Sequence, residues 1–195
     1  MTLHVICAAY QRIIPLRILI DSFVVQTNPN WKLYVIHDGP MPEELHDIRD
    51  LYAKDERISF SSTKKRIGHS GFPNRDMMIK SIEGDPGDFV MSTNDDNYYV
   101  PTFVDEMLKE VAPGVGIVYC NMIHSHFGYT PLYTTLKVYY IDMGAFAILL
   151  PLAKKVGIMN ITDIADGLFA QDCLAECNAT GLATKKVEKI LYIHN

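Results

Sequence analysis

Cysteine and tryptophan are scarce in this sequence. Its 195 residues include 4 cysteines and 1 tryptophan. Four cysteines are few for a disulfide-stapled fold, and Cys7 and Cys120 lie inside apolar runs, where buried reduced thiols are expected. Cys173 and Cys177 are close enough to share a helix face, but no second Cys or His pair lies nearby in the sequence to complete a zinc site. The cysteines therefore predict neither a disulfide framework nor structural zinc.

Long apolar runs are also missing. The longest, such as residues 145–152, fall far short of the roughly 20 residues that a membrane-spanning helix needs. The N-terminus lacks the basic region, apolar core and cleavage site of a secretory signal. We therefore expect a cytoplasmic protein with no membrane span.

Positive charge is not in excess. The chain has 18 Lys and Arg against 23 Asp and Glu, a formal net charge of -5, and its one basic cluster is residues 64–66. Binding to nucleic-acid backbones depends on clustered positive charge, so we expect no nucleic-acid partner. A 48% share of hydrophobic residues is ordinary for a folded protein, and the length predicts a single domain over residues 1–195.

Strand-like and helix-like segments alternate along the chain. Periodicity and turn residues predict strands at residues 2–9, 33–37, 57–60, 88–92, 115–120, 137–150 and 187–193. Helices are expected at about residues 15–23, 43–52, 74–83, 101–111 and 167–179. This alternation predicts an α/β fold with a mainly parallel sheet and helices on both faces. Ligands bind such sheets beyond the carboxyl ends of the strands.

Several common catalytic motifs are absent. The sequence has no phosphate loop of the form G-x-x-x-x-G-K-[ST], no G-x-G-x-x-G after a strand, no H-E-x-x-H and no G-x-S-x-G. The sequence therefore does not favour a P-loop ATPase, a nicotinamide dehydrogenase, a zinc protease or an α/β-hydrolase.

Polar side chains follow three of the predicted strands. They are residues 10–12 (YQR) after the first strand, Asp38 after the second and residues 94–97 (NDDN) after the fourth. Adjacent carboxylates repel each other unless a cation joins them, and hard divalent ions prefer oxygen ligands. The acidic segment is therefore a candidate metal site. The alternative is an Asn/Asp-rich turn that leads into the helix at Pro101.

These segments resemble a known family. Residues 5–12 (VICAAYQR), 35–39 (VIHDG) and 89–97 (FVMSTNDDN) resemble, in order and spacing, the nucleotide-side signatures of family 2 glycosyltransferases, which have the Rossmann-like GT-A fold. Residues 169–172 (FAQD) resemble the Glu-Asp motif of that family. The resemblance covers nearly the whole chain and implies a nucleotide-binding half over residues 1–100 and an acceptor-side half over residues 101–195.

The resemblance implies a metal-dependent enzyme that moves a sugar, expected to be a hexose, from a nucleoside-diphosphate sugar to an acceptor hydroxyl with inversion. A UDP-sugar is the expected donor, and a saccharide or another hydroxyl compound is the acceptor. The implied nucleotide-binding residues are Ala9, Tyr10, Arg12, Asp38, Arg66, Arg75 and Asp95. Within that set, Asp38 would pair with the base, Tyr10 would flank it, and Asp95 would face the ribose.

The metal implied by the resemblance is Mn or Mg. Asp96 would hold it, with Asp95 beside it, and a late histidine, His194, would reach the metal or the diphosphate. Such an ion neutralises charge that develops on the leaving nucleotide.

The acceptor side offers candidates for binding and for the general base. Residues 121–133 are rich in aromatic rings suited to stacking on a sugar, among them His124 and Tyr129, and Gly144 falls in the acceptor-side segment. Asp172 is the preferred base because it holds the Asp place of the Glu-Asp-like motif, and Asp166 is the second candidate. The chain lacks the C-terminal extension of many relatives, so its acceptor pocket is expected to be open or completed by a second copy in a homo-oligomer.

Two other functions stay open from the sequence. A sugar-phosphate nucleotidyltransferase uses a similar sheet, but normally with a glycine-rich loop that residues 10–12 do not provide. A catalytically inactive sugar-nucleotide-binding module is the other, because Asn94 and Gln171 stand where the family commonly has acids. Release of pyrophosphate would mark the first, and binding without turnover the second.

Overall fold

The first half of the chain builds a parallel sheet around its N-terminal strand. In the computed structural model, which describes residues 1–195, β1 (Leu3–Ala9) lies between β2 (Trp31–His37) and β4 (Phe89–Asn94), and β3 (Ile58–Ser62) borders β2. All three pairings are parallel. β1 is mostly apolar, β4 is apolar over its first three residues, and both are almost fully buried, as expected for central strands covered on both faces. Their carboxyl ends therefore meet at one edge of the sheet.

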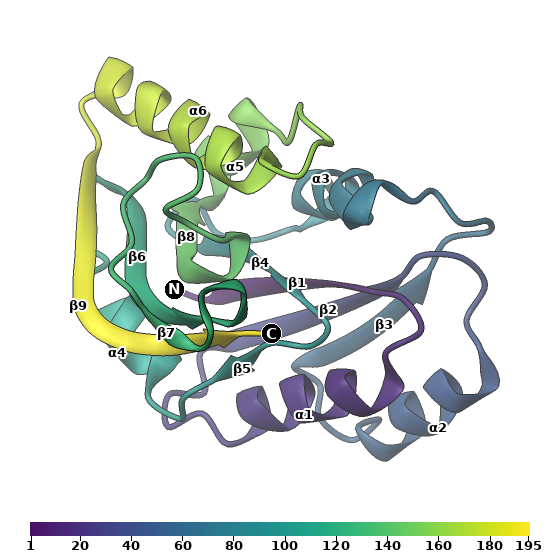
Figure 1. Ribbon diagram of the computed structural model, residues 1–195. Helices are drawn as coiled ribbons and strands as arrows, with labels where there is room; N and C mark the ends of the chain where they lie inside the picture. The colour runs from purple at the N-terminus through teal and green to yellow at the C-terminus, as the bar shows by residue number, and fades with distance from the viewer.

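The second half extends the same sheet with mixed directions. It adds β5 (Tyr98–Tyr99), β6 (Val115–His124), β7 (Thr130–Leu132), β8 (Phe146–Leu149) and β9 (Ala183–His194). The strand order is β3-β2-β1-β4-β8-β6-β9-β5, with β7 paired to β6. β8 runs antiparallel to both of its neighbours, whereas β6 and β9 are parallel. Figure 1 shows β9 following β6 and then bending beneath the sheet to reach β5.

Helices cover both faces of the sheet. They are α1 (Ile13–Val24), α2 (Glu43–Leu51), α3 (Phe72–Ser81), α4 (Phe103–Lys109), α5 (Leu150–Val156) and α6 (Ala165–Thr180). In Figure 1, α1, α2 and α4 lie on one face, and α3, α5 and α6 lie on the other. The predicted α/β architecture with a mainly parallel sheet is confirmed. None of the helices is long and apolar enough to span a membrane.

The core follows the hydrophobic periodicity of the sequence. On α1, the apolar residues Leu16, Leu19, Ile20 and Phe23 are buried, and they recur at the spacing that places side chains on one helix face. One cluster of 50 buried hydrophobic residues runs through the whole chain. Both halves therefore share a single core, which holds the strand ends of the two halves in fixed relative positions.

Residues 137–150 do not form the long strand that their composition predicts. Only β8 is extended, because a short 3₁₀ turn, η3 (Met143–Ala145), precedes it and α5 begins at Leu150. The side chain of Asp142 accepts a hydrogen bond from Gly144 N and holds this turn, and Pro151 suits the first turn of a helix. The helix α5 was not predicted: Leu150 was assigned to the expected strand, and residues 151–156 were assigned to no element.

Gly144 lies in the core rather than on a ligand-binding surface. Its carbonyl accepts a hydrogen bond from Tyr99 Oη at 3.2 Å. A Cβ atom at this position would lie 2.6 Å from Tyr99 Oη and 2.8 Å from Tyr192 Cζ, in a region where both rings are fully buried. The acceptor-binding role expected for Gly144 is therefore not supported, and the glycine is explained by close packing.

Replacing Gly144 with alanine should destabilise the protein. Overpacking of a filled core typically costs about 1 to 3 kcal/mol, which urea denaturation would measure as a lower midpoint with an unchanged slope. Gly87→Ala is the matched control, since no atom lies within 4 Å of a Cβ built there. Equal midpoints for the two variants would contradict this account.

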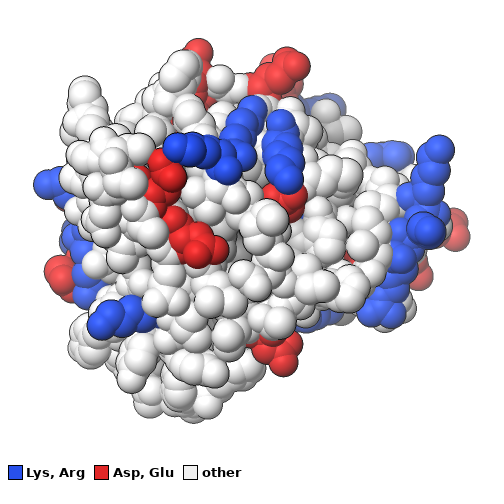
Figure 2. Space-filling view, turned by 90° about the horizontal axis from the view of Figure 1, so that it is seen from above, with Lys and Arg blue, Asp and Glu red and all other residues white.

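The face over α3, α5 and α6 carries mixed charge. Viewed from above, Lys and Arg side chains are interspersed with Asp and Glu side chains, and large areas hold neither (Figure 2). Two ion pairs on this side join Lys155 to Glu176 at 2.7 Å and Lys80 to Asp76 at 2.6 Å. Such exposed pairs add little to stability.

Candidate functional site

Two adjoining cavities open at the carboxyl ends of β1 and β4. We name them after the roles expected from the sequence. The donor-side cavity has a volume of about 510 Å³, and the acceptor-side cavity has about 430 Å³. Ser70, Arg75 and Asn94 line both, so the two cavities meet at these residues. All seven residues predicted to bind the nucleotide line the donor-side cavity: Ala9, Tyr10, Arg12, Asp38, Arg66, Arg75 and Asp95.

Asp38 organises one wall of the donor-side cavity. Its carboxylate accepts hydrogen bonds from Ile67 N and Gly68 N, both at 2.8 Å, and from Asn74 Nδ2 at 3.1 Å. Burial alone would raise the pKa of Asp38, but these hydrogen bonds outweigh it, so the pKa lies below the usual value. Asp38 is therefore ionised at neutral pH and fixes the loop after β3.

A flat surface lies beside Asp38. The guanidinium of Arg66 sits 4.1 Å from the centroid of the Tyr10 ring, and the ring of His37 stacks on the same tyrosine at 5.9 Å. The side chain of Arg66 is 62% exposed, so it forms the outer layer of this stack. Planar groups of this kind can flank a nucleobase.

The loop over both cavities depends on a close backbone approach. Gly71 has a φ of +75°, and a Cβ there would lie 2.7 Å from the Cβ of Ala8. Its neighbours His69 and Ser70 also have positive φ values, of 54° and 50°. Residues 68–71 therefore hold an unusual backbone conformation directly over the end of β1, where strain often accompanies a binding site.

The acidic segment after β4 is held by Tyr10, Arg12 and the last residue of the chain. Asp95 accepts a hydrogen bond from Tyr10 N at 2.9 Å, and Arg12 forms ion pairs with both Asp95 and Asp96. Burial raises the pKa of Asp95, although the Tyr10 hydrogen bond and Arg12 oppose this rise. Asn195 Nδ2 donates to the Asp96 carbonyl at 2.8 Å.

Asp96 can serve as a ligand for a divalent ion. Its Oδ1 atom is buried and has no hydrogen-bond partner. No group of three or more His, Cys, Asp or Glu side chains comes together as a metal site. One or two carboxylates are nevertheless enough for Mg where a bound phosphate supplies further oxygens, so the donor set fits an ion that is shared with a diphosphate.

His194 has partners other than the acidic segment. Its Nδ1 lies 3.1 Å from Ser125 Oγ, and its Nε2 lies 3.7 Å from Asp142 Oδ2. The ring stacks on His124 with 4.2 Å between centroids. No hydrogen bond or ion pair joins His194 to Asp96, and the histidine lines the acceptor-side cavity, so its metal-binding role stays a prediction.

Arg75 lies buried where the cavities meet. Its Nη2 donates to Asn94 Oδ1 at 2.6 Å and to the Thr93 carbonyl at 3.2 Å, and Nη1 donates to the Ser70 carbonyl. Asn94, which replaces an acid of the family pattern, thus holds a cation without neutralising it. Arg75 Nε has no partner. The site therefore presents a buried positive charge to both cavities.

Asp142 and Asp166 carry acidic groups into the acceptor-side cavity. Burial and the nearby negative charge of Asp142 raise the pKa of Asp166 to about 7. Asp142 was not among the predicted residues, because it lay inside the segment read as a strand. The sequence offered one signal for Asp142: it is a carboxylate within an apolar run, two positions before Gly144.

Asp172 does not reach either cavity. It is exposed on α6, and this helix begins at Ala165, two residues earlier than expected. The earlier start places Asp166 in the first turn and Asp172 two turns further along, away from the sheet edge. The preference for Asp172 over Asp166 is therefore not supported by the geometry.

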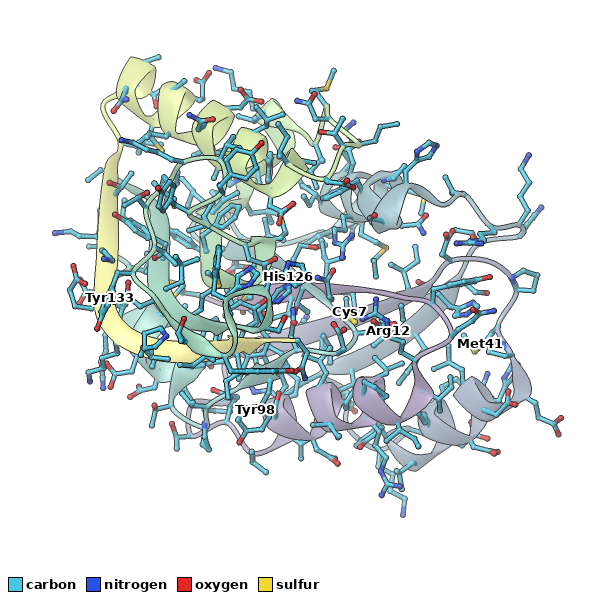
Figure 3. The ribbon with its side chains drawn as sticks, viewed as in Figure 1. Cys7, Arg12, Met41, Tyr98, His126 and Tyr133 are labelled. Atoms are coloured by element: carbon cyan, nitrogen blue, oxygen red, sulfur yellow. The ribbon has the colours of Figure 1, made fainter.

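The aromatic stretch after β6 is only partly at the site. His124 lines the acceptor-side cavity, whereas Tyr129 is exposed and donates from its hydroxyl to Asn195 Oδ1 at 2.8 Å. Figure 3 shows Arg12 where the chain leaves β1, His126 near the centre of the molecule, and Tyr133 at the margin beside β9. Of the aromatic side chains in this stretch, His124, His126 and Phe127 line the cavity, whereas Tyr129 and Tyr133 do not.

Comparisons with known proteins agree with this geometry. Residues 4–161 match the sequence profile described as Glycosyl transferase family 2, and the chain belongs to that family. A search of curated protein sequences finds no match.

Solved structures show the same fold at low sequence identity. The chain superposes on S. aureus TarS 1–349 in complex with UDP with a TM-score of 0.80 at 15% identity, covering 99% of this chain and 60% of that one. Another crystal structure of S. aureus TarS gives a TM-score of 0.80 at 17% identity, covering 100% of this chain and 37% of that one. The mannosyltransferase PcManGT from Pyrobaculum calidifontis, in complex with GDP-Man and Mn2+, gives 0.73 at 14% identity, covering 98% and 56%. The chain thus spans between about a third and three fifths of these relatives.

Proposed function

We propose that this chain transfers a hexose from a nucleoside-diphosphate sugar to an acceptor hydroxyl, with inversion at the anomeric carbon. One observation carries the proposal: the donor-side and acceptor-side cavities meet at Arg75 and Asn94, with Asp95 of the acidic segment lining the first and Asp166 lining the second. A transfer enzyme needs this arrangement because donor and acceptor must meet at the bond that is exchanged.

The donor is proposed to lie along residues of the first half of the chain. Tyr10 and Arg66 would flank the base, the ionised Asp38 would accept a hydrogen bond from its edge, and Asp95 would face the ribose. A structure of TarS holds UDP and another holds UDP-GlcNAc, which supports a UDP-sugar as the donor here. Residues 1–100 and 101–195 would then be the nucleotide-binding and acceptor-side halves.

A divalent ion, Mn or Mg, is part of the proposal. Asp96 would hold it, and the ion would supply positive charge that stabilises the leaving diphosphate. PcManGT was solved with Mn2+, which supports manganese. Arg12, whose side chain is 53% exposed, can turn from the carboxylates toward the diphosphate, and the buried Arg75 adds a fixed positive charge.

Asp166 is proposed as the general base in place of Asp172. It would take the proton of the acceptor hydroxyl while the oxygen attacks the anomeric carbon. The bond from that carbon to the diphosphate oxygen breaks, and the electron pair leaves with the diphosphate. His124 would form part of the acceptor wall, and a second copy of the chain could complete the open side.

Ligand binding and product analysis test this function. Thermal shifts with UDP, GDP, ADP and CDP, each with and without Mn2+, should identify the nucleotide, because a bound ligand stabilises the folded state. Incubation with the matching nucleotide-sugars and a panel of saccharides should then release the free nucleoside diphosphate. Release of pyrophosphate from a nucleoside triphosphate and a sugar phosphate, or binding without any turnover, would contradict the proposal.

Asp38→Ala should weaken nucleotide binding about tenfold or more. The variant loses a charged acceptor, whose hydrogen bonds are worth about 1.5 to 3 kcal/mol, and frees the loop that Ile67 and Gly68 anchor. Calorimetric titration with the nucleoside diphosphate measures the change. Asp55→Ala, an acid that pairs only with Arg57 at the other end of β3, is the control. If the affinity of Asp38→Ala stays within twofold of the wild-type value, Asp38 does not bind the nucleotide and is only a turn residue.

A further inference from the structure

Arg12 is paired with the acidic segment that follows β4. Its Nη1 donates a hydrogen bond to Asp96 Oδ2, and its Nε lies 3.5 Å from Asp95 Oδ1. One guanidinium thus bridges two adjacent carboxylates, which would repel each other without a cation between them. Arg12 is the one side chain that forms an ion pair with either acid.

Arg12 also stands between Asp96 and the donor-side cavity. Asp95 lines that cavity, but Asp96 does not. Asp96 instead lines a separate cavity of about 310 Å³, together with Ile18 of α1 and Asn195, and Arg12 is the one residue that lines both cavities. A diphosphate in the donor-side cavity could therefore share an ion with Asp96 only after the Arg12 side chain moves.

The side chain of Arg12 can move while its backbone stays in place. Its carbonyl accepts a hydrogen bond from Leu16 N at 3.0 Å at the start of α1, which anchors the main chain. The side chain itself is 53% exposed, and ion pairs of exposed groups add little to stability. Asp95, by contrast, is buried and accepts a hydrogen bond from Tyr10 N at 2.9 Å. The guanidinium is therefore the movable part of this cluster, and the carboxyl group of Asp95 is the fixed part.

We propose that Arg12 occupies the carboxylates that would hold the divalent ion until a nucleoside diphosphate binds, and that the ion and the diphosphate together displace it. The inference rests on the proposed function and deepens it. Arg12 at Asp96 would be repelled by a dication on the same carboxylate, whereas a diphosphate carries enough negative charge to accept both cations. Arg12 would then turn to the phosphate oxygens, which suit its planar fork of donors. The chain would thus bind the ion weakly on its own and tightly with the nucleotide.

Arg12→Gln tests the inference through Mn2+ binding. Without nucleotide, the variant should bind Mn2+ about fivefold more tightly than the wild-type chain, because its acids have no cation to release. With saturating UDP this gain should disappear or reverse, because Arg12 has already left the acids in the wild-type complex. Electron paramagnetic resonance of free Mn2+ measures the affinity in both states. By linkage, Mn2+ should improve the UDP Kd of the variant by a smaller factor than that of the wild-type chain.

Two further variants separate displacement from other effects. Arg12→Lys keeps a cation at this position and should bind Mn2+ without nucleotide as weakly as the wild-type chain does. Arg49→Gln is the matched control, since it removes an exposed arginine of α2 that pairs with Asp50 at 2.8 Å and lines neither the donor-side nor the acceptor-side cavity. Its Mn2+ affinity should be unchanged. The thermal unfolding midpoint of each variant shows that it is folded.

The movement of Arg12 can also be followed in the wild-type chain. Nitrogen-15 NMR of the arginine Nε–H groups reports each guanidinium, and the signals missing in Arg12→Gln and Arg49→Gln identify these two residues. Mg2+ added together with UDP should shift the Arg12 signal and leave the Arg49 signal in place. An Arg12 signal that Mg2+ and UDP do not move would overturn the inference.

The Mn2+ titrations separate this inference from the proposed function. An equal Mn2+ affinity of Arg12→Gln and the wild-type chain without nucleotide overturns the inference. Equal tightening with and without UDP also overturns it, because Arg12 would then be a fixed neighbouring charge. If the wild-type chain still uses a UDP-sugar with Mn2+ in either case, the proposed function stands and the inference alone fails. If Mn2+ binding changes as expected but no sugar is transferred, the proposed function fails while the displacement of Arg12 stands.

Discussion

Replacing Asp166 with asparagine should lower kcat about 100-fold or more while the donor Kd stays nearly unchanged. The variant keeps the shape of the side chain and removes the proton acceptor, and general base catalysis typically contributes about 100- to 10,000-fold. Asp166 lines the acceptor-side cavity and not the donor-side cavity, which is why nucleotide binding should be spared. Steady-state kinetics with saturating donor and calorimetric titration with the nucleoside diphosphate measure the two quantities.

Asp172→Asn is the matched control for this experiment. Asp172 lies on the same helix but is exposed and outside both cavities, so kcat should change by less than about twofold. An inactive Asp172→Asn together with an active Asp166→Asn would show that the structure places the base incorrectly and that the motif at residues 169–172 was aligned correctly.

Asp96→Asn should abolish the metal dependence of nucleotide binding. The change removes the charge from the one carboxylate that has a buried oxygen without a partner. Loss of even an outer-shell partner typically costs about 10- to 100-fold in metal affinity, so loss of a direct ligand should cost about 100-fold or more. Electron paramagnetic resonance of Mn2+, titrated with protein at a fixed concentration of the nucleoside diphosphate, measures the bound fraction.

The control for the metal experiment is Asp105→Asn on α4. Asp105 is an acid of equal charge whose contact is an ion pair with Lys109 at 2.6 Å on the surface. Mn2+ binding should be unchanged in this variant. If Asp96→Asn also binds Mn2+ as tightly as the wild-type chain, Asp96 is not the ligand, and its pairing with Arg12 is its structural role.

Most of the donor side could be predicted from the sequence because its residues directly follow parallel strands. Tyr10, Asp38 and Asp95 come within a few positions of the ends of β1, β2 and β4, and the parallel register of these strands carries them to one edge. What the sequence did not show is that Asp38 already accepts three hydrogen bonds, two from the loop residues Ile67 and Gly68 and one from Asn74 in α3. The two loop residues lie in a segment without periodicity, so no pattern in the sequence places them at Asp38.

The acceptor side was less predictable because its position depends on helix boundaries and on the core. Asp172 was preferred on the resemblance of residues 169–172 to a motif, whereas the structure places Asp166, in the first turn of α6, at the cavity. Gly144 was conspicuous in the sequence, but a glycine is needed there because Tyr99 and Tyr192 pack against it and leave no room for a side chain. Both tyrosines come from distant strands, so no local pattern reports their contact.

The bend of β9 has a consequence for how the protein folds. Its last residues pair with β5 across a separation of almost a hundred residues, with Tyr98 opposite Ile193, and Asn195 then bonds the Asp96 carbonyl. Contacts between such distant residues require the closure of a long loop, which tends to make them late and slow to form. The acidic segment after β4, which Tyr10 and Arg12 also contact, would thus gain its contact with Asn195 only when β9 docks. Local opening of β9 would therefore loosen that segment before it disturbed the strand β1 at the centre of the sheet.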